Sequence, residues 1–153
     1  MTAISPLRSI AAVVVSLMLL NFMDATFAQI LVSVAGDGPP ADAAAFLAVR
    51  NRPLVLGLIV ITHALAALLV GYILGRIAGV HEVRHAAAAA AVITVVYIVA
   101  FVATNPMLPP AWVRVTMLVL TPPALIAGAH IRAEARAIRA EPAGTVRPEE
   151  ERR

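Results

Sequence analysis

Four long apolar runs follow one another along this chain, separated by short segments rich in proline, glycine or charged residues. The runs cover about residues 7–35, 54–76, 85–104 and 111–131. A helix rises about 1.5 Å per residue, so about 20 apolar residues cross the roughly 30 Å hydrocarbon core of a bilayer. Each run is about that long or longer. The pattern therefore predicts an all-α membrane protein folded as a bundle of four transmembrane helices.

The segments between and after the runs predict how the helices are connected. Residues 36–53 begin with a Gly-Asp-Gly-Pro-Pro breaker and continue with an apolar stretch, which predicts an outer loop with a short surface helix. Pro122 and Pro123 predict a kink in the fourth helix. The chain divides into a transmembrane domain, residues 1–131, and a tail, residues 132–153, which is helical and then disordered.

The composition supports a membrane protein and excludes several kinds of chemistry. Hydrophobic residues make up 61% of the chain and charged residues 14%, against about 45–50% and about 25% in soluble domains. The mean hydropathy is +0.89. Because the chain has no cysteine, disulfides, thiolate metal sites and thiol catalysis are excluded. The basic residues lie at the ends of the apolar runs, so we expect the lipid bilayer, and no nucleic acid, as a partner.

All 12 basic residues are arginines, and their placement predicts the topology. If the N-terminus is cytoplasmic, nine arginines lie on the inner side and three, Arg50, Arg52 and Arg114, on the outer side. The positive-inside rule then places both termini in the cytoplasm. The composition, rich in arginine and alanine and without lysine, favours a multi-pass protein of a bacterial inner membrane.

The first run has a second interpretation, as a secretory signal peptide that ends with a cleavage site near residue 28. Residues 1–28 would then be absent from the mature protein. The apolar run continues beyond that point as far as residue 35. We therefore expect the run to be retained as a membrane helix.

A small set of polar side chains lies inside the apolar runs. Asn21 and Asp24 share one helix face because they are three residues apart. Asp24 and His63 lie about 16 Å and about 14 Å below the outer ends of their runs, so we expect them to pair, with Tyr97 or Arg114 within reach. A carboxylate in hydrocarbon is costly without a partner. The pair is interpreted either as a proton-titrating or ion-binding centre or as a hydrogen-bonded clamp between helices.

Small residues follow His63 at intervals of four along the second run, at Ala67, Gly71, Gly75 and Gly79. Such a row forms a flat face against which another helix packs closely. It predicts that the second run is the central helix of the bundle. The face is either a dimerisation surface, which gives a homo-oligomer or a larger membrane complex, or a packing surface for another helix of the same chain.

The segment between the second and third runs matches the pattern H-E-x-x-H, with His81, Glu82 and His85. In zinc hydrolases, two histidines one turn apart bind the metal and the glutamate acts as general base. A third ligand is needed, and His130 or Glu134 lies on the same side of the membrane. The alternative is a charged helix end at the lipid headgroups, and we expect no metal here.

The order of four short stretches along the chain resembles that in other membrane proteins. They are the outer loop, a glycine-containing end of the second run, an arginine-histidine turn and a proline-containing outer loop, at residues 36–49, 71–76, 84–86 and 105–110. Their order resembles that in a set of small four-span bacterial membrane proteins with no assigned activity. The resemblance implies a fold and no catalytic function.

Three functions are compatible with these patterns. The first is a non-enzymatic accessory or scaffold subunit of the inner membrane, which acts through helix packing and uses no cofactor. The second is a small proton-coupled transporter that uses Asp24 and His63. The third is a zinc-dependent membrane hydrolase that uses His81, Glu82 and His85.

Overall fold

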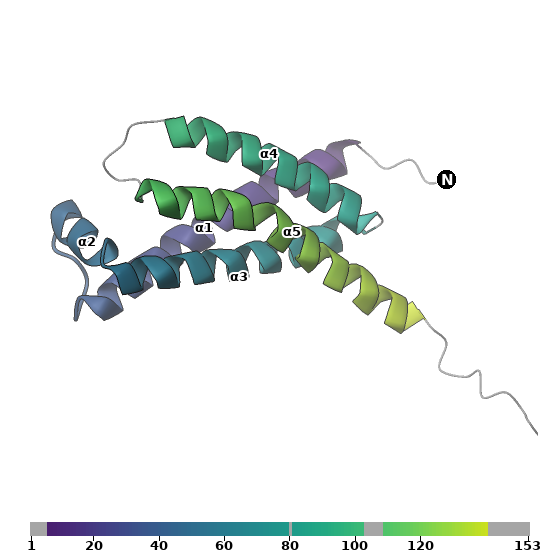
Figure 1. Ribbon diagram of the computed structural model, residues 1–153. Helices are drawn as coiled ribbons and strands as arrows, with labels where there is room; N and C mark the ends of the chain where they lie inside the picture. The colour runs from purple at the N-terminus through teal and green to yellow at the C-terminus, as the bar shows by residue number, and fades with distance from the viewer. Residues whose placement is uncertain (1–5, 80, 103–108, 141–153) are drawn as a thin grey trace, which may run out of the picture.

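The structure is a computed structural model. In the residues that it describes, all regular secondary structure is helical. The described residues are 6–79, 81–102 and 109–140. Figure 1 shows the long helices lying side by side and a short helix at the end of the bundle. The helices are α1 (Pro6–Ala35), α2 (Ala43–Arg50), α3 (Pro53–Ala78), α4 (Glu82–Val102) and α5 (Ala111–Ala140).

Among the described residues, four helices are long and apolar enough to cross a membrane: α1, α3, α4 and α5. The predictions of an all-helical fold and of four helices able to span a membrane are therefore confirmed for the described residues. One boundary differs from the sequence pattern, because α4 begins at Glu82, before the expected residue 85. α5 continues to Ala140 and so includes the first part of the tail, which the sequence analysis gives as helical. The part of the tail expected to be disordered, residues 143–153, lies outside the described residues.

Local interactions stabilise both ends of the short helix α2. The Asp42 side chain accepts a hydrogen bond from the backbone N–H of Ala45 at 2.8 Å, as a helix N-cap. Arg50 lies in the last turn, where a cation is favourable. α2 contacts both α1 and α3, so the outer loop is folded back onto the bundle. This contact brings Arg50 into the protein interior, where it is buried.

α3 is the central helix, as the sequence pattern predicts. It packs against each of the other four helices, whereas the backbones of α1 and α5 do not approach each other in the described residues. Its side chains Ala67, Val70 and Leu74 are completely buried. The contacts between helices therefore converge on α3.

The closest approach in the bundle is the crossing of α3 and α5. A Cβ atom added to Gly71 would lie 2.0 Å from the Leu125 carbonyl oxygen. One added to Gly128 would lie 1.9 Å from the carbonyl oxygen of Leu68. The small-residue row of α3 is therefore used for packing within the chain. Its last member, Gly79, has a φ of 73° and caps α3, with its N–H bonded to Gly75 O at 3.1 Å.

α5 contains two consecutive prolines in its middle, Pro122 and Pro123. Figure 1 shows that the helix axis changes direction about halfway along. Proline has no N–H and its ring clashes with the preceding turn, so a bend at this pair is expected. The residues of α5 that approach α3 most closely, Leu125 and Gly128, lie just after this proline pair.

Candidate functional site

Three helices meet at His63, whose side chain is fully buried in the middle of α3. Its Nδ1 atom lies 3.0 Å from Oδ1 and 2.9 Å from Oδ2 of Asp24 on α1. Its Nε2 atom lies 2.8 Å from the Thr121 hydroxyl on α5. The imidazole therefore connects α1 to α5, two helices whose backbones do not approach each other.

The hydrogen bonds of Thr121 determine where the protons of this network lie. The Thr121 hydroxyl donates to the Met117 carbonyl oxygen at 2.6 Å. Having only one hydrogen, it then acts as acceptor toward His63, so the Nε2–H donates. Nδ1 and the Asp24 carboxylate are left to share one proton. The pair is then either an imidazolium with a carboxylate or a neutral imidazole with a carboxylic acid, and both forms have no net charge. This neutrality explains how an acid is tolerated inside an apolar helix.

A cavity of about 310 Å³ opens beside Asp24. The Asp24 side chain is 26% exposed, whereas that of His63 is 0% exposed. Neither His63 nor Thr121 lines the cavity, so Asp24 is the member of the network that faces it. The cavity is lined by Asn21, Asp24, Ala28, Phe46, Arg50, Ile59, Tyr97, Ala100, Phe101, Pro109, Arg114 and Met117.

Two arginines form part of the cavity wall, and each lies over an aromatic ring. The guanidinium of Arg114 lies 4.6 Å from the ring centre of Phe101 and donates to its carbonyl oxygen at 2.9 Å. The guanidinium of Arg50 lies 5.8 Å from the ring centre of Phe46 and donates to the Asn51 side chain at 3.2 and 3.3 Å. Burial lowers the pKa of Arg50, but arginine still keeps its charge at neutral pH.

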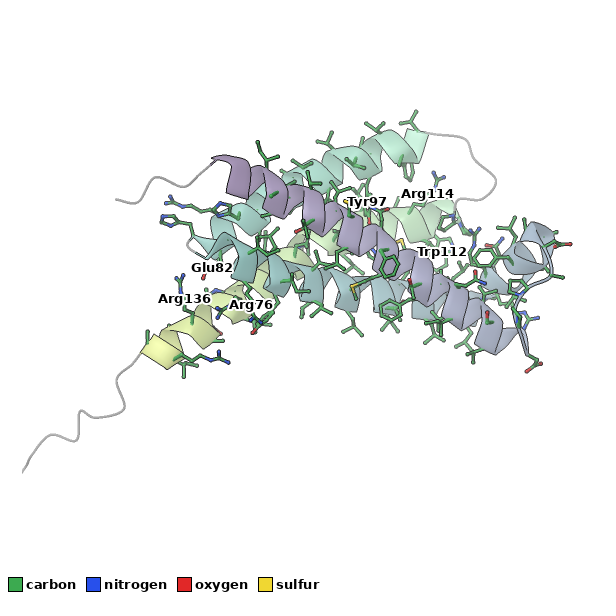
Figure 2. All side chains as sticks on the ribbon, turned by 180° about the vertical axis from the view of Figure 1, so that it is seen from behind. Arg76, Glu82, Tyr97, Trp112, Arg114 and Arg136 are labelled. Atoms are coloured by element: carbon green, nitrogen blue, oxygen red, sulfur yellow. The ribbon has the colours of Figure 1, made fainter. Side chains whose placement is uncertain are left out.

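The structure brings together the polar side chains that the sequence singles out. Asn21, Asp24, Tyr97 and Arg114 all line the cavity, and His63 lies directly behind Asp24. The ring centres of Tyr97 and His63 are 6.1 Å apart. Figure 2 shows Tyr97 and Arg114 on the side of the bundle nearer α2.

Sequence reasoning missed two residues of the site, Thr121 and Arg50. A threonine in an apolar helix usually bonds to its own preceding turn, which Thr121 also does, so its second bond leaves no trace in the sequence. In the sequence, Arg50 resembles any charged residue of a loop between two apolar runs. Its position at the end of a short amphipathic helix was the available signal, because that helix folds back onto the bundle.

The H-E-x-x-H residues do not assemble a metal site. The zinc interpretation needs both histidines on one helix face, but α4 begins at Glu82, and His81 lies before it with a φ of 54°. His85 Nδ1 lies 3.1 Å from the carbonyl oxygen of His81. Of the expected third ligands, His130 and Glu134 pair with each other at 3.3 Å on the surface. Within the described residues, no three histidine, aspartate or glutamate side chains lie close enough to hold a metal ion.

Glu82 forms an ion pair that holds three segments together. Its carboxylate lies 2.8 Å from Arg136 of α5, and its side chain is only 4% exposed. Arg136 also donates to the carbonyl oxygen of Gly79, at the end of α3. Figure 2 shows Glu82, Arg136 and Arg76 at the end of the bundle away from α2. The charged segment is thus a structural lock between the α3–α4 turn and α5.

We expect Glu82→Gln to lower the free energy of unfolding by about 1–2 kcal/mol. Breaking a fully buried ion pair costs about 3–5 kcal/mol, and Arg136, at 46% exposed, is partly hydrated, which reduces this figure. The matched control is Glu134→Gln, whose pair with His130 is exposed and worth about 0–1 kcal/mol. Urea unfolding in detergent, followed by circular dichroism, measures both. Equal effects of the two substitutions would contradict the assignment of Glu82 as a lock.

No family model, no curated protein and no solved structure matches this chain. The four-span layout noted in the sequence therefore carries no functional assignment.

Proposed function

We propose that this protein is a small proton-coupled transporter of a bacterial inner membrane, with both termini in the cytoplasm. The observation that carries the proposal is the contact of one carboxylate, Asp24, with both the cavity and a fully buried imidazole. A group in this position exchanges its proton with the cavity while its partner remains shielded from lipid and water. Ionisable residues inside membrane helices commonly mark such proton or substrate pathways.

The network provides two charge states that differ by one proton. With the shared proton present, Asp24 and His63 together are neutral. With the proton lost, the pair has one negative charge, and that charge faces the cavity through Asp24. A ligand in the cavity therefore experiences a field that depends on the protonation of the pair. Reciprocally, the ligand changes the proton affinity of the pair, which is the requirement for coupling.

The scaffold interpretation has less support. It relied on the small-residue row of α3 as a contact face for a partner. Ala67, Gly71 and Gly75 are buried inside the chain, and Gly71 lies against the backbone of α5. The row does not provide an exposed surface for a second protein. The geometry therefore favours the proton-coupled interpretation.

The test is to follow the protonation of His63 by NMR of histidine ring ¹⁵N in nanodiscs. The chain has only four histidines, and His63→Gln identifies the resonances of this one. Spectra are recorded across about pH 5–8, the range in which imidazole groups commonly change charge, and we expect the His63 shifts to depend on pH because Nδ1 shares a proton with Asp24. Asp24→Asn, which cannot hold the shared proton, is expected to change the ¹⁵N chemical shift of Nδ1 and its dependence on pH.

The exposed histidines His81 and His130 serve as reference resonances because they lie outside the network of Asp24, His63 and Thr121. Circular dichroism checks that the variants keep their helical content. If the His63 nitrogens of the native protein do not change over this range, the pair carries no exchangeable proton. The proposal would then be wrong.

A further inference from the structure

The cavity beside Asp24 has a chemical character that indicates what it binds. We infer that it takes a small organic monoanion, whose carboxylate lies on Arg50 and Arg114 and whose apolar body lies against Phe46, Phe101 and Met117. The inference rests on the proposed function, because it names the ligand class of the same site.

The charges of the wall favour an anion. Of the described residues that line the cavity, two are arginines and one is an acid, Asp24, which is paired with His63. The cavity therefore has a positive excess whenever the pair holds its shared proton. Arginine presents a planar fork of donors that matches a carboxylate in two-point contact. A carboxylate is thus the simplest ligand group for this wall.

An unsatisfied donor supports the same conclusion. Nε of Arg114 is buried and has no hydrogen-bond acceptor in the described part of the chain. Leaving a buried donor unpaired is unfavourable by about 1–3 kcal/mol. The carboxylate of a ligand would satisfy such a donor. Arg50, the second cation, is itself buried at 5% exposure, so its charge is not directed into solvent.

The size and the lining of the cavity favour an apolar body of limited length. Most of the lining residues are apolar, and two of them are phenylalanines. A volume of about 310 Å³ is about twice that of a 150 Å³ cavity that binds benzene. The space therefore suits one ring with a short acid chain. A suitable probe is 3-phenylpropionate.

The binding of such an anion is expected to depend on pH. The charged and titratable groups around Asp24 are His63 on α3, Tyr97 on α4, Arg114 on α5 and Arg50 on α2. Loss of the shared proton gives the pair a negative charge, which repels the anion. The affinity should therefore rise as the pH falls, and binding of the anion should cause proton uptake.

The experiment is titration calorimetry of the full chain in nanodiscs with 3-phenylpropionate at several pH values, with empty nanodiscs as the blank. We expect binding to weaken at least tenfold in Arg114→Gln and in Arg50→Gln. The matched control is Arg52→Gln, because Arg52 lies on the same side but bonds to Ala35 O and does not line the cavity. Arg114→Lys, which keeps the charge but loses the fork, should bind with intermediate affinity, and this result separates lost recognition from lost folding.

Two other probes define what would overturn the inference. Equal binding of the neutral 3-phenylpropanamide would show that the cavity selects apolar bodies and not anions. Equal binding of inorganic phosphate would show that the apolar wall contributes nothing. Absence of 3-phenylpropionate binding while His63 still titrates would overturn the ligand assignment alone. Absence of both binding and titration would overturn the proposed function as well.

Discussion

Replacing Gly128 by alanine is expected to separate α3 from α5 and to destabilise the bundle by about 3 kcal/mol. The added methyl group would lie 1.9 Å from the Leu68 carbonyl oxygen and 2.8 Å from the Tyr72 nitrogen. Both are backbone atoms of α3, so no side chain can rotate away. Overpacking in protein cores costs about 1–3 kcal/mol, and a clash with backbone belongs at the upper end of that range. Urea unfolding in detergent measures the loss.

The matched control is Gly57→Ala in α3, the helix against which Gly128 packs. A Cβ atom at Gly57 would meet nothing within 4 Å. Alanine is favoured over glycine in a helix by about 1 kcal/mol, so this variant should be as stable as the native protein or more stable. If Gly128→Ala behaved in the same way as Gly57→Ala, the close crossing described here would be incorrect.

A double-mutant cycle of Asp24→Ala and His63→Ala is expected to give a coupling energy of about 2 kcal/mol. Hydrogen bonds between membrane helices average only about 0.6 kcal/mol, with a maximum near 1.7. The contact here is stronger, because both carboxylate oxygens lie within 3.0 Å of one nitrogen and the imidazole is fully buried. Charge-assisted hydrogen bonds of this kind are about twice as strong as neutral ones.

The same cycle on His130 and Glu134 provides the comparison. That pair is also a histidine with a carboxylate, but both side chains are more than 60% exposed. Its coupling should be below about 0.5 kcal/mol. A coupling for Asp24 and His63 of that same size would indicate that the pair is an ordinary packing contact, without the shared proton.

The sequence predicts the two residues at the centre of the site because burial of charge constrains them strongly. An acid and an imidazole at similar depths in neighbouring apolar helices have few other partners, and Asp24 and His63 do pair. Thr121 and Arg50 were not predictable in the same way. Their roles depend on the rotation of α5 and on the folding of α2 back onto the bundle, which are tertiary properties.

The zinc pattern shows the opposite case, in which a local motif misleads. The spacing of His81 and His85 suits a metal only if both belong to one helix. The helix begins one residue later than His81, at Glu82. The carboxylate of Glu82, in the first turn of this helix, pairs with Arg136. Arg136 lies 54 positions further along the chain, so no local pattern identifies it as the partner.

The backbone-to-backbone crossing at Gly71 and Gly128 also limits how α3 and α5 can move, because a shift of one helix along the other would bring backbone atoms into collision. The backbones of α1 and α5 do not approach each other in the described residues, and the hydrogen bonds of Asp24, His63 and Thr121 span the space between them. A displacement of α1 away from α3 would therefore separate the carboxylate from the imidazole. Such a movement of one helix would also end the sharing of the proton.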